Sequence, residues 1–164
     1  MGAGKTAIGR ELARELHLEF LDADQELERR TGADIPLIFE KEGEAGFRRR
    51  ERELLQELTQ RQGLVLATGG GAVLDPANRE ALSRGFVIYL KASVTAQAAR
   101  TGNNRNRPLL QSGDREKRLE ELYSVRAPLY EGLAALTVDT DSGHVRQIAR
   151  HIIKALEQQD AASG

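Results

Sequence analysis

The first residues of the chain, MGAGKT, match the second half of a phosphate-binding loop. Such a loop has the pattern G-x-x-x-x-G-K-[ST] and lies between a buried strand and a helix. Gly4, Lys5 and Thr6 fit this pattern, and the apolar residues after them recur as in an amphipathic helix. In the loop, backbone N–H groups hold phosphate oxygens, the lysine reaches the transferred phosphate and the hydroxyl binds magnesium. The motif predicts this chemistry, and a surface turn with the same letters is the alternative.

Two aspartates stand at the end of a short apolar run, in the sequence EFLDAD at 19–24. If the backbone stays extended, Asp22 and Asp24 point the same way. One carboxylate would then help to hold hydrated magnesium, and the other would receive the proton of a substrate hydroxyl. The alternative is that one of them caps the helix that follows.

An acidic residue lies inside the apolar stripe of the helix predicted from about 44 to 61. At about 100° per residue, Glu51 falls among Phe47, Leu54 and Leu58, and Arg48 falls at the edge of their stripe. A buried carboxylate is costly unless it is paired. Arg48 can make that pair and turn its remaining donors toward a carboxylate ligand. The neighbouring arginines at 49, 50 and 52 are expected on a solvated face.

Three consecutive glycines, Gly69, Gly70 and Gly71, follow the strand-like run LVLAT at 64–68. They can form a flexible connector. After a buried strand, however, glycine lets backbone N–H groups approach a ligand without an intervening side chain, and we favour that interpretation. The run ends in Thr68 rather than an acid, so Asp22 is the natural candidate for magnesium.

Further arginines lie in the second half of the chain. Arg100, Arg105 and Arg107 flank a Gly/Asn-rich stretch at 101–114, which is either a solvated loop or a lid that covers the transferred phosphate. For Arg126, in the sequence RAPLY, the residues alone favour neither catalysis nor helix termination.

The elements that must position these residues alternate along the chain. Continuous apolar runs separated by amphipathic stretches predict an α/β fold with a parallel sheet covered by helices on both faces. Strands are predicted at 19–22, 64–68, 86–92 and 135–140. Two helices are predicted to begin near residues 5 and 35. The other predicted helices span about 24–30, 44–61, 76–84, 93–100, 115–131 and 144–158. In such a sheet, ligands bind beyond the carboxyl ends of the strands, where the aspartates and glycines gather.

Composition limits the classes of partner. The 164 residues suit one compact domain, and a net charge of -1 favours neither nucleic acid nor an anionic membrane surface. The chain has no cysteine and three histidines, which disfavours a structural zinc site and suits a reducing cytoplasm. Its apolar runs are far shorter than the roughly 20 residues that span a bilayer. We therefore expect a cytoplasmic protein with no nucleic acid or membrane partner.

Taken in order, these segments resemble the shikimate kinase family over nearly the whole chain. The resemblance rests on GAGKT, DAD, FRRRE, GGGAV, RPLL and RAPLY, which occur in the family's order and spacing. It implies a P-loop NTPase fold with a five-stranded parallel sheet, a lid and a substrate-binding region. It also implies a monomer that uses ATP and Mg²⁺ to phosphorylate the 3-hydroxyl of shikimate, in the biosynthesis of chorismate and aromatic amino acids.

The family pattern assigns roles to individual residues. Gly2, Ala3 and Gly4 would form the phosphate loop with Lys5 and Thr6. Thr6 would bind magnesium, and Asp22 would bind it through water. Asp24 would act as the base, Arg48 and Arg126 would bind the shikimate carboxylate, Glu51 would orient Arg48, and the three glycines would contact the substrate. Arg107 would close onto the phosphates as a catalytic residue, and Arg100 and Pro108 would lie beside adenine. The implied limits are a kinase domain at 1–158, a shikimate-binding region at about 24–61, a lid at about 101–114 and a disordered tail at 159–164.

Two departures from the family pattern qualify the resemblance. The family's first, central strand and the loop's first glycine would precede Met1, so we expect a reading frame that extends upstream by roughly ten residues, enough for one strand and half a loop. The region from Asp141 to Gly143 also lacks a basic residue that some relatives place beside the base. The alternatives are a kinase for another hydroxylated metabolite, such as gluconate or a nucleoside monophosphate, and a relic that only binds ADP.

Overall fold

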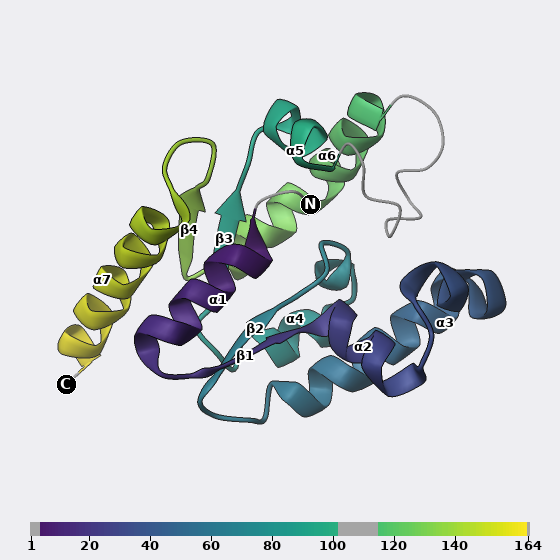
Figure 1. Cartoon of the computed structure of the whole chain (residues 1–164), viewed down its shortest axis with the longest axis horizontal. Helices are drawn as coiled ribbons and strands as arrows, with labels where there is room; N and C mark the ends of the chain where they lie inside the picture. Colours follow the sequence, from purple (N-terminus) through teal and green to yellow (C-terminus); the bar gives the residue numbers. More distant parts are fainter. Residues whose placement is uncertain (1–3, 102–114, 164) are drawn as a thin grey trace.

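Four short strands form two parallel pairs in the computed structural model, which describes residues 4–101 and 115–163 (Figure 1). Strand β1 (Glu19–Asp22) pairs with β2 (Leu64–Ala67), and β3 (Ile88–Lys91) pairs with β4 (Leu136–Asp139). Both pairs are parallel and in register over four residues. The predicted strand positions and their parallel direction are confirmed.

Helices separate the strands along the chain, as the sequence predicts. Most carry an apolar stripe that packs on the sheet and a charged face that meets solvent. They are α1 (Lys5–Leu16), α2 (Ala23–Thr31), α3 (Ile35–Leu58), α4 (Pro76–Leu82), α5 (Val94–Thr101), α6 (Arg115–Leu133) and α7 (Val145–Ser163), with a short 3₁₀ turn, η1, at Ala72–Leu74.

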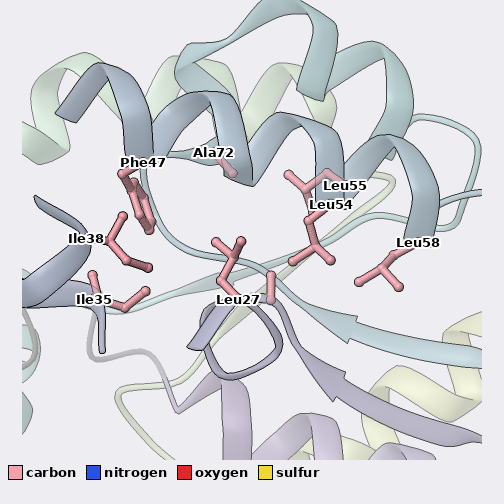
Figure 2. Close-up of a cluster of buried hydrophobic side chains, with 9 residues drawn as sticks. Leu27, Ile35, Ile38, Phe47, Leu54, Leu55, Leu58 and Ala72 are labelled. Atoms are coloured by element: carbon pink, nitrogen blue, oxygen red, sulfur yellow. The ribbon is translucent and has the colours of Figure 1, made fainter. Parts of the chain in front are cut away.

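Alternation along β2 sends its side chains into two separate cores. Leu64 and Leu66 pack against a cluster built on α2 and α3, which includes Leu27 and Phe47 (Figure 2). Val65 packs on the other face, against a cluster built on α1, α7 and β4. Helices therefore cover both faces, which agrees with the predicted fold class.

The two strand pairs do not join within the described part of the chain. A cavity of about 440 Å³ lies between β2 and β3. The resemblance implies a five-stranded sheet, whereas residues 4–101 and 115–163 hold four strands in two pairs. The family's first strand has no counterpart among these residues.

One break between helices lies where the sequence predicts it, and the ends of α6 and α7 differ from the predicted ones. Gly43, with φ 70° and ψ -178°, breaks α3 between the two helical stretches that the sequence predicts. Helix α6 continues through Pro128 to Leu133. Helix α7 extends to Ser163, beyond the predicted end near 158 and into the segment expected to be a disordered tail, because Gln159, Ala161 and Ala162 favour a helix.

Several predicted features lie outside the described residues: the lid at 102–114, with Arg105, Arg107 and Pro108, and Gly2 and Ala3 of the phosphate loop. Among the described helices, none has the length and hydropathy needed to cross a membrane.

Candidate active site

The start of α1 provides an anion-binding helix end. Gly4 precedes the helix in a left-handed conformation, with φ 78°, which glycine adopts without the strain a side chain would add. Among the described residues no side chain caps this end, and the positive end of the helix dipole favours an anion. Lys5 and Thr6 are the first two residues of the helix and are half-buried. This geometry fits the phosphates of a nucleotide.

The Asp22 carboxylate connects this helix with the next one. Its Oδ2 accepts a hydrogen bond of 3.2 Å from the Thr6 hydroxyl. Its Oδ1 accepts hydrogen bonds of 3.0 and 3.2 Å from the backbone N–H groups of Asp24 and Gln25 and so caps α2. Asp22 therefore is a helix cap, and its second oxygen lies beside the predicted magnesium ligand.

Thr6 and Asp22 fit a magnesium site that is completed by phosphate oxygens. No cluster of three or more His, Cys, Asp or Glu side chains suited to a metal occurs within 4–101 and 115–163. Mg²⁺ usually takes only one or two protein carboxylates, and phosphate and water oxygens complete its octahedron. Hydroxyl and carboxylate oxygens are donors of the right kind.

The substitution Asp22→Asn distinguishes the helix-capping role of Asp22 from its proposed role at magnesium. Asparagine caps helices as well as aspartate does, so Asp22→Asn should leave the melting temperature within a few degrees of the parent value. The lost charge should raise the magnesium concentration needed for half-maximal activity by about tenfold, equivalent to ~1.4 kcal/mol. Titrating magnesium at fixed ATP, beside a thermal melt, measures both effects. An unchanged magnesium requirement would remove Asp22 from the metal site.

Asp24 lies on α2 rather than on an extended strand. The chain becomes helical at Ala23, immediately after β1, so the expectation that Asp22 and Asp24 point the same way from extended backbone is wrong. Asp24 instead faces the glycine triplet. A Cβ added at Gly69 would lie 3.3 Å from Asp24 Oδ1 and 3.2 Å from Glu51 Oε1. The predicted base, the buried glutamate and the first glycine thus converge.

Glu51 and Arg48 form the ion pair that the helical pattern predicts. Arg48 Nη1 donates a hydrogen bond of 2.7 Å to Glu51 Oε2, and only 1% of Glu51 is exposed. Burial raises the pKa of Glu51, and the Arg48 charge opposes that rise. Glu51 Oε1 is buried and accepts no hydrogen bond within the described part of the chain. This oxygen suits contact with a hydroxyl-bearing ligand, because an unpaired buried acceptor is costly.

Gly71 lies directly against the Arg48 guanidinium. A Cβ at this position would overlap Arg48 Nη2 and come within 2.7 Å of its Cζ. A side chain at position 71 would therefore have to displace the Arg48 guanidinium, a role for this glycine that differs from the predicted contact between its backbone and a substrate.

Gly71→Ala should displace the Arg48 side chain and weaken binding of a carboxylate substrate. We expect the substrate KM to rise by about tenfold, because a charge-assisted hydrogen bond is worth ~1.5–3 kcal/mol, and the KM for ATP to stay nearly constant. Gly132→Ala is a matched control, since no described atom beyond its chain neighbours and its own helix backbone lies within 4 Å of its added Cβ. Equal substrate KM values in Gly71→Ala and Gly132→Ala would contradict the role of Gly71 in positioning Arg48 for substrate binding.

Arg126 is buried inside α6. Only 4% of the residue is exposed, and its Nε donates no hydrogen bond to any described residue. Burial lowers its pKa, the Tyr130 side chain opposes this, and the Arg48 charge lowers it further. Arg126 and Arg48 therefore lie within electrostatic range of each other. A ligand carboxylate would relieve this repulsion and supply an acceptor.

Tyr130 belongs to the same site and was missed by sequence reasoning. Its hydroxyl donates a hydrogen bond to the backbone carbonyl of Gly70, and its ring lies 4.9 Å from that of Tyr89. Burial raises the Tyr130 pKa, and the Arg126 charge opposes the rise. The available signal was its place one helical turn after Arg126, on the same face.

The remaining predicted contacts are only partly described. Arg100 lies near the end of α5, with a side chain outside the description. The Asp141 carboxylate accepts a hydrogen bond of 2.9 Å from the Ser93 N–H, which ties the β4–α7 loop to the start of α5.

The chain is similar to known proteins over nearly its whole length. A family model described as "Shikimate kinase" matches residues 1–157. Shikimate kinase of Thioalkalivibrio sulfidiphilus is 58% identical over 93% of this chain and 80% of its own length. The Halorhodospira halophila enzyme is 54% identical over 97% of this chain and 90% of its own length.

Solved structures of this family have the same fold. Shikimate kinase from Acinetobacter baumannii in complex with shikimate superposes with a TM-score of 0.95 at 52% identity, over 97% of this chain and 89% of that one. The Aquifex aeolicus enzyme superposes with a TM-score of 0.84 at 31% identity, over 98% and 94%. Matches of this extent and identity place the chain in the shikimate kinase family.

Proposed function

We propose that the chain transfers the γ-phosphoryl group of ATP to the 3-hydroxyl of shikimate and gives shikimate 3-phosphate and ADP. The observation that carries the proposal is the pair of arginines, Arg48 and Arg126, in one buried site beside Asp24. Arg48 is paired with Glu51, whereas the buried Arg126 Nε has no hydrogen-bond acceptor among the described residues, so a substrate carboxylate would supply its partner. The product is an intermediate on the route to chorismate and aromatic amino acids. A cytoplasmic monomer is part of the same proposal.

In this proposal some of the described residues bind the substrate, and Asp24 accepts its proton. Arg48 and Arg126 hold the shikimate carboxylate, and Glu51 holds Arg48 in its orientation through the 2.7 Å hydrogen bond. Backbone groups of Gly69 and Gly70 border the ring of the substrate, and Tyr130 fixes that backbone through its bond to Gly70. These contacts place the 3-hydroxyl against Asp24.

Phosphoryl transfer then needs few covalent steps from the protein. Asp24 takes the proton of the 3-hydroxyl, whose oxygen forms a bond to the γ-phosphorus as the bond to the leaving β-phosphate oxygen breaks. Lys5 and the first N–H groups of α1 hold the phosphates, with Thr6 and Asp22 as magnesium ligands. Magnesium, when bound, neutralises charge on the phosphates. Arg107, from the predicted lid, would close over the transferred group.

Coupled release of ADP tests the proposal. The chain is mixed with ATP and magnesium and with shikimate, gluconate, a nucleoside monophosphate or no acceptor. We expect ADP release that depends on shikimate, with formation of one phosphate ester. Faster turnover with another acceptor would assign a different kinase activity, and ADP binding without turnover on any acceptor would make the chain a nucleotide-binding relic.

A further inference from the structure

Side chains of α4 hold the turn that follows the glycine triplet. Asn78 Nδ2 donates a hydrogen bond of 3.0 Å to the backbone carbonyl of Ala72, and Arg79 Nη1 donates one of 2.6 Å to the carbonyl of Val73. Both carbonyls belong to η1, the 3₁₀ turn that begins directly after Gly71. Two neighbouring residues of one helix thus fix two successive carbonyls of the turn.

The contact between Asn78 and Ala72 is buried. Only 1% of Asn78 is exposed, which is unusual for asparagine, and Ala72 lies within the core cluster built on α2 and α3 (Figure 2). The Asp75 N–H reaches the same carbonyl only at 3.4 Å. A buried carbonyl that loses its donor raises the free energy of the fold, because water cannot replace that donor. Asn78 is therefore the principal donor to Ala72 among the described residues.

Helix α4 is itself attached to α3, the helix that carries Arg48. Arg52 Nε donates a hydrogen bond of 2.6 Å to Asp75 Oδ2 at the start of α4, and Gln56 Nε2 donates one of 3.1 Å to the Ala77 carbonyl. Arg52 and Gln56 follow Arg48 at intervals of four residues, so the three lie along one side of α3. The helix that supports the turn is thus held by the helix that presents the arginine.

The same turn meets Arg48 through Gly71. A Cβ at this glycine would come within 2.7 Å of Arg48 Cζ, so the backbone lies directly against the guanidinium. Contacts therefore run in a closed ring, from α3 to α4, from α4 to η1, and from Gly71 back to Arg48. Within this ring, a shift of η1 would change the position of the guanidinium.

We propose that Asn78 and Arg79 are positioning residues for substrate recognition by Arg48. They hold η1 so that Gly71 stays against the guanidinium and directs it toward the carboxylate of the acceptor. Neither residue touches the acceptor, because both act through the backbone of the turn. This inference rests on the proposed function, in which Arg48 binds the carboxylate of shikimate.

The alternative is that these two side chains only stabilise the fold. In that case, their loss would lower the melting temperature without a specific effect on one ligand. A positioning role instead concentrates the effect on the affinity for shikimate, and the effect disappears when Arg48 is absent. The two roles therefore differ in measurable ways.

Asn78→Leu tests the proposal, since leucine is close to asparagine in shape but donates no hydrogen bond. We expect the shikimate dissociation constant, measured with ADP and magnesium present, to rise by about tenfold, because Arg48 would lose a charge-assisted hydrogen bond. The ADP dissociation constant should stay nearly constant. In an Arg48→Ala background, the same substitution should raise the shikimate constant by less than about twofold, because the contact through which it acts is gone.

A second variant and a matched control accompany this test. Arg79→Met applies if Asn78→Leu does not fold, because Arg79 is only half-buried, and it should raise the shikimate constant by about threefold. Gln97→Leu is the control, since Gln97 is also buried and its Nε2 donates a hydrogen bond of 2.7 Å to the Ala92 carbonyl. It should lower the melting temperature and leave shikimate affinity unchanged. Equal losses of shikimate affinity in Gln97→Leu and Asn78→Leu would overturn the proposal.

A measurement without acceptor separates this inference from the proposed function. The Nε–H signal of Arg48 in an NMR spectrum of the unliganded protein, assigned by its loss in Arg48→Ala, should shift in Asn78→Leu and Arg79→Met but not in Gln97→Leu. An unmoved signal, an unchanged shikimate constant in the folded variants, or an equal rise in the Arg48→Ala background would each contradict positioning. If the parent protein binds no shikimate, the proposed function fails, and the Arg48 signal still decides whether α4 positions this arginine.

Discussion

Asp24→Asn should lower turnover by a factor on the order of 10² to 10⁴, the usual contribution of a positioned general base. Asp24 lies at the start of α2, and its carboxylate approaches Gly69 beside the buried Glu51. Asparagine has nearly the same shape and cannot take the hydroxyl proton. Affinity for ADP should be nearly unchanged, because the proposed site of the nucleotide phosphates is the start of α1.

Steady-state assays of ADP release and a separate ADP titration measure these two quantities. Asp160→Asn is a matched control, since it makes the same chemical change on an exposed part of α7. Turnover of Asp24→Asn within a few-fold of the parent protein would show that Asp24 is not the base.

Arg126→Ala should raise the shikimate KM by a factor on the order of 10² to 10³. Loss of one partner from a buried, hydrogen-bonded charge pair costs ~2–5 kcal/mol, and Arg126 is 4% exposed in the absence of ligand. The ADP dissociation constant should change little. Arg118→Ala provides the control, because Arg118 lies on the same helix but pairs with Glu121 at the surface.

A shikimate analogue without the carboxylate separates recognition from folding. It should bind the parent protein weakly and lose little more when Arg126 is removed. If the analogue loses as much affinity as shikimate does, Arg126 acts on the fold or on ATP, and the carboxylate assignment fails.

The strands and the Glu51 site could be predicted because each depends on local periodicity. Apolar runs such as Leu64–Ala67 are too short for helices and read as buried strands. Glu51 was found because a charged residue interrupts an apolar stripe whose helical phase is set by its neighbours. Its burial and its pairing with Arg48 are both confirmed.

The features that the sequence could not decide depend on contacts between distant residues. For Asp22, capping and metal binding stood as alternatives, and the structure makes it the cap of α2 while its other oxygen meets Thr6. For the RAPLY segment, helix termination stood as an open alternative, and α6 continues through Pro128. The helical spacing from Arg126 places Tyr130 on the same face, but its hydroxyl partner, the Gly70 carbonyl, lies 60 residues away along the chain and could not be predicted.

The Asp22 carboxylate also connects the proposed nucleotide site with the helix that carries the proposed base. One oxygen contacts Thr6 at the nucleotide end, and the other anchors the first turn of α2, which carries Asp24. A ligand that immobilises Asp22 therefore reduces the conformational entropy that α2 still has to lose when the acceptor binds. Such linkage is reciprocal, so any factor by which nucleotide tightens acceptor binding must equal the factor by which acceptor tightens nucleotide binding.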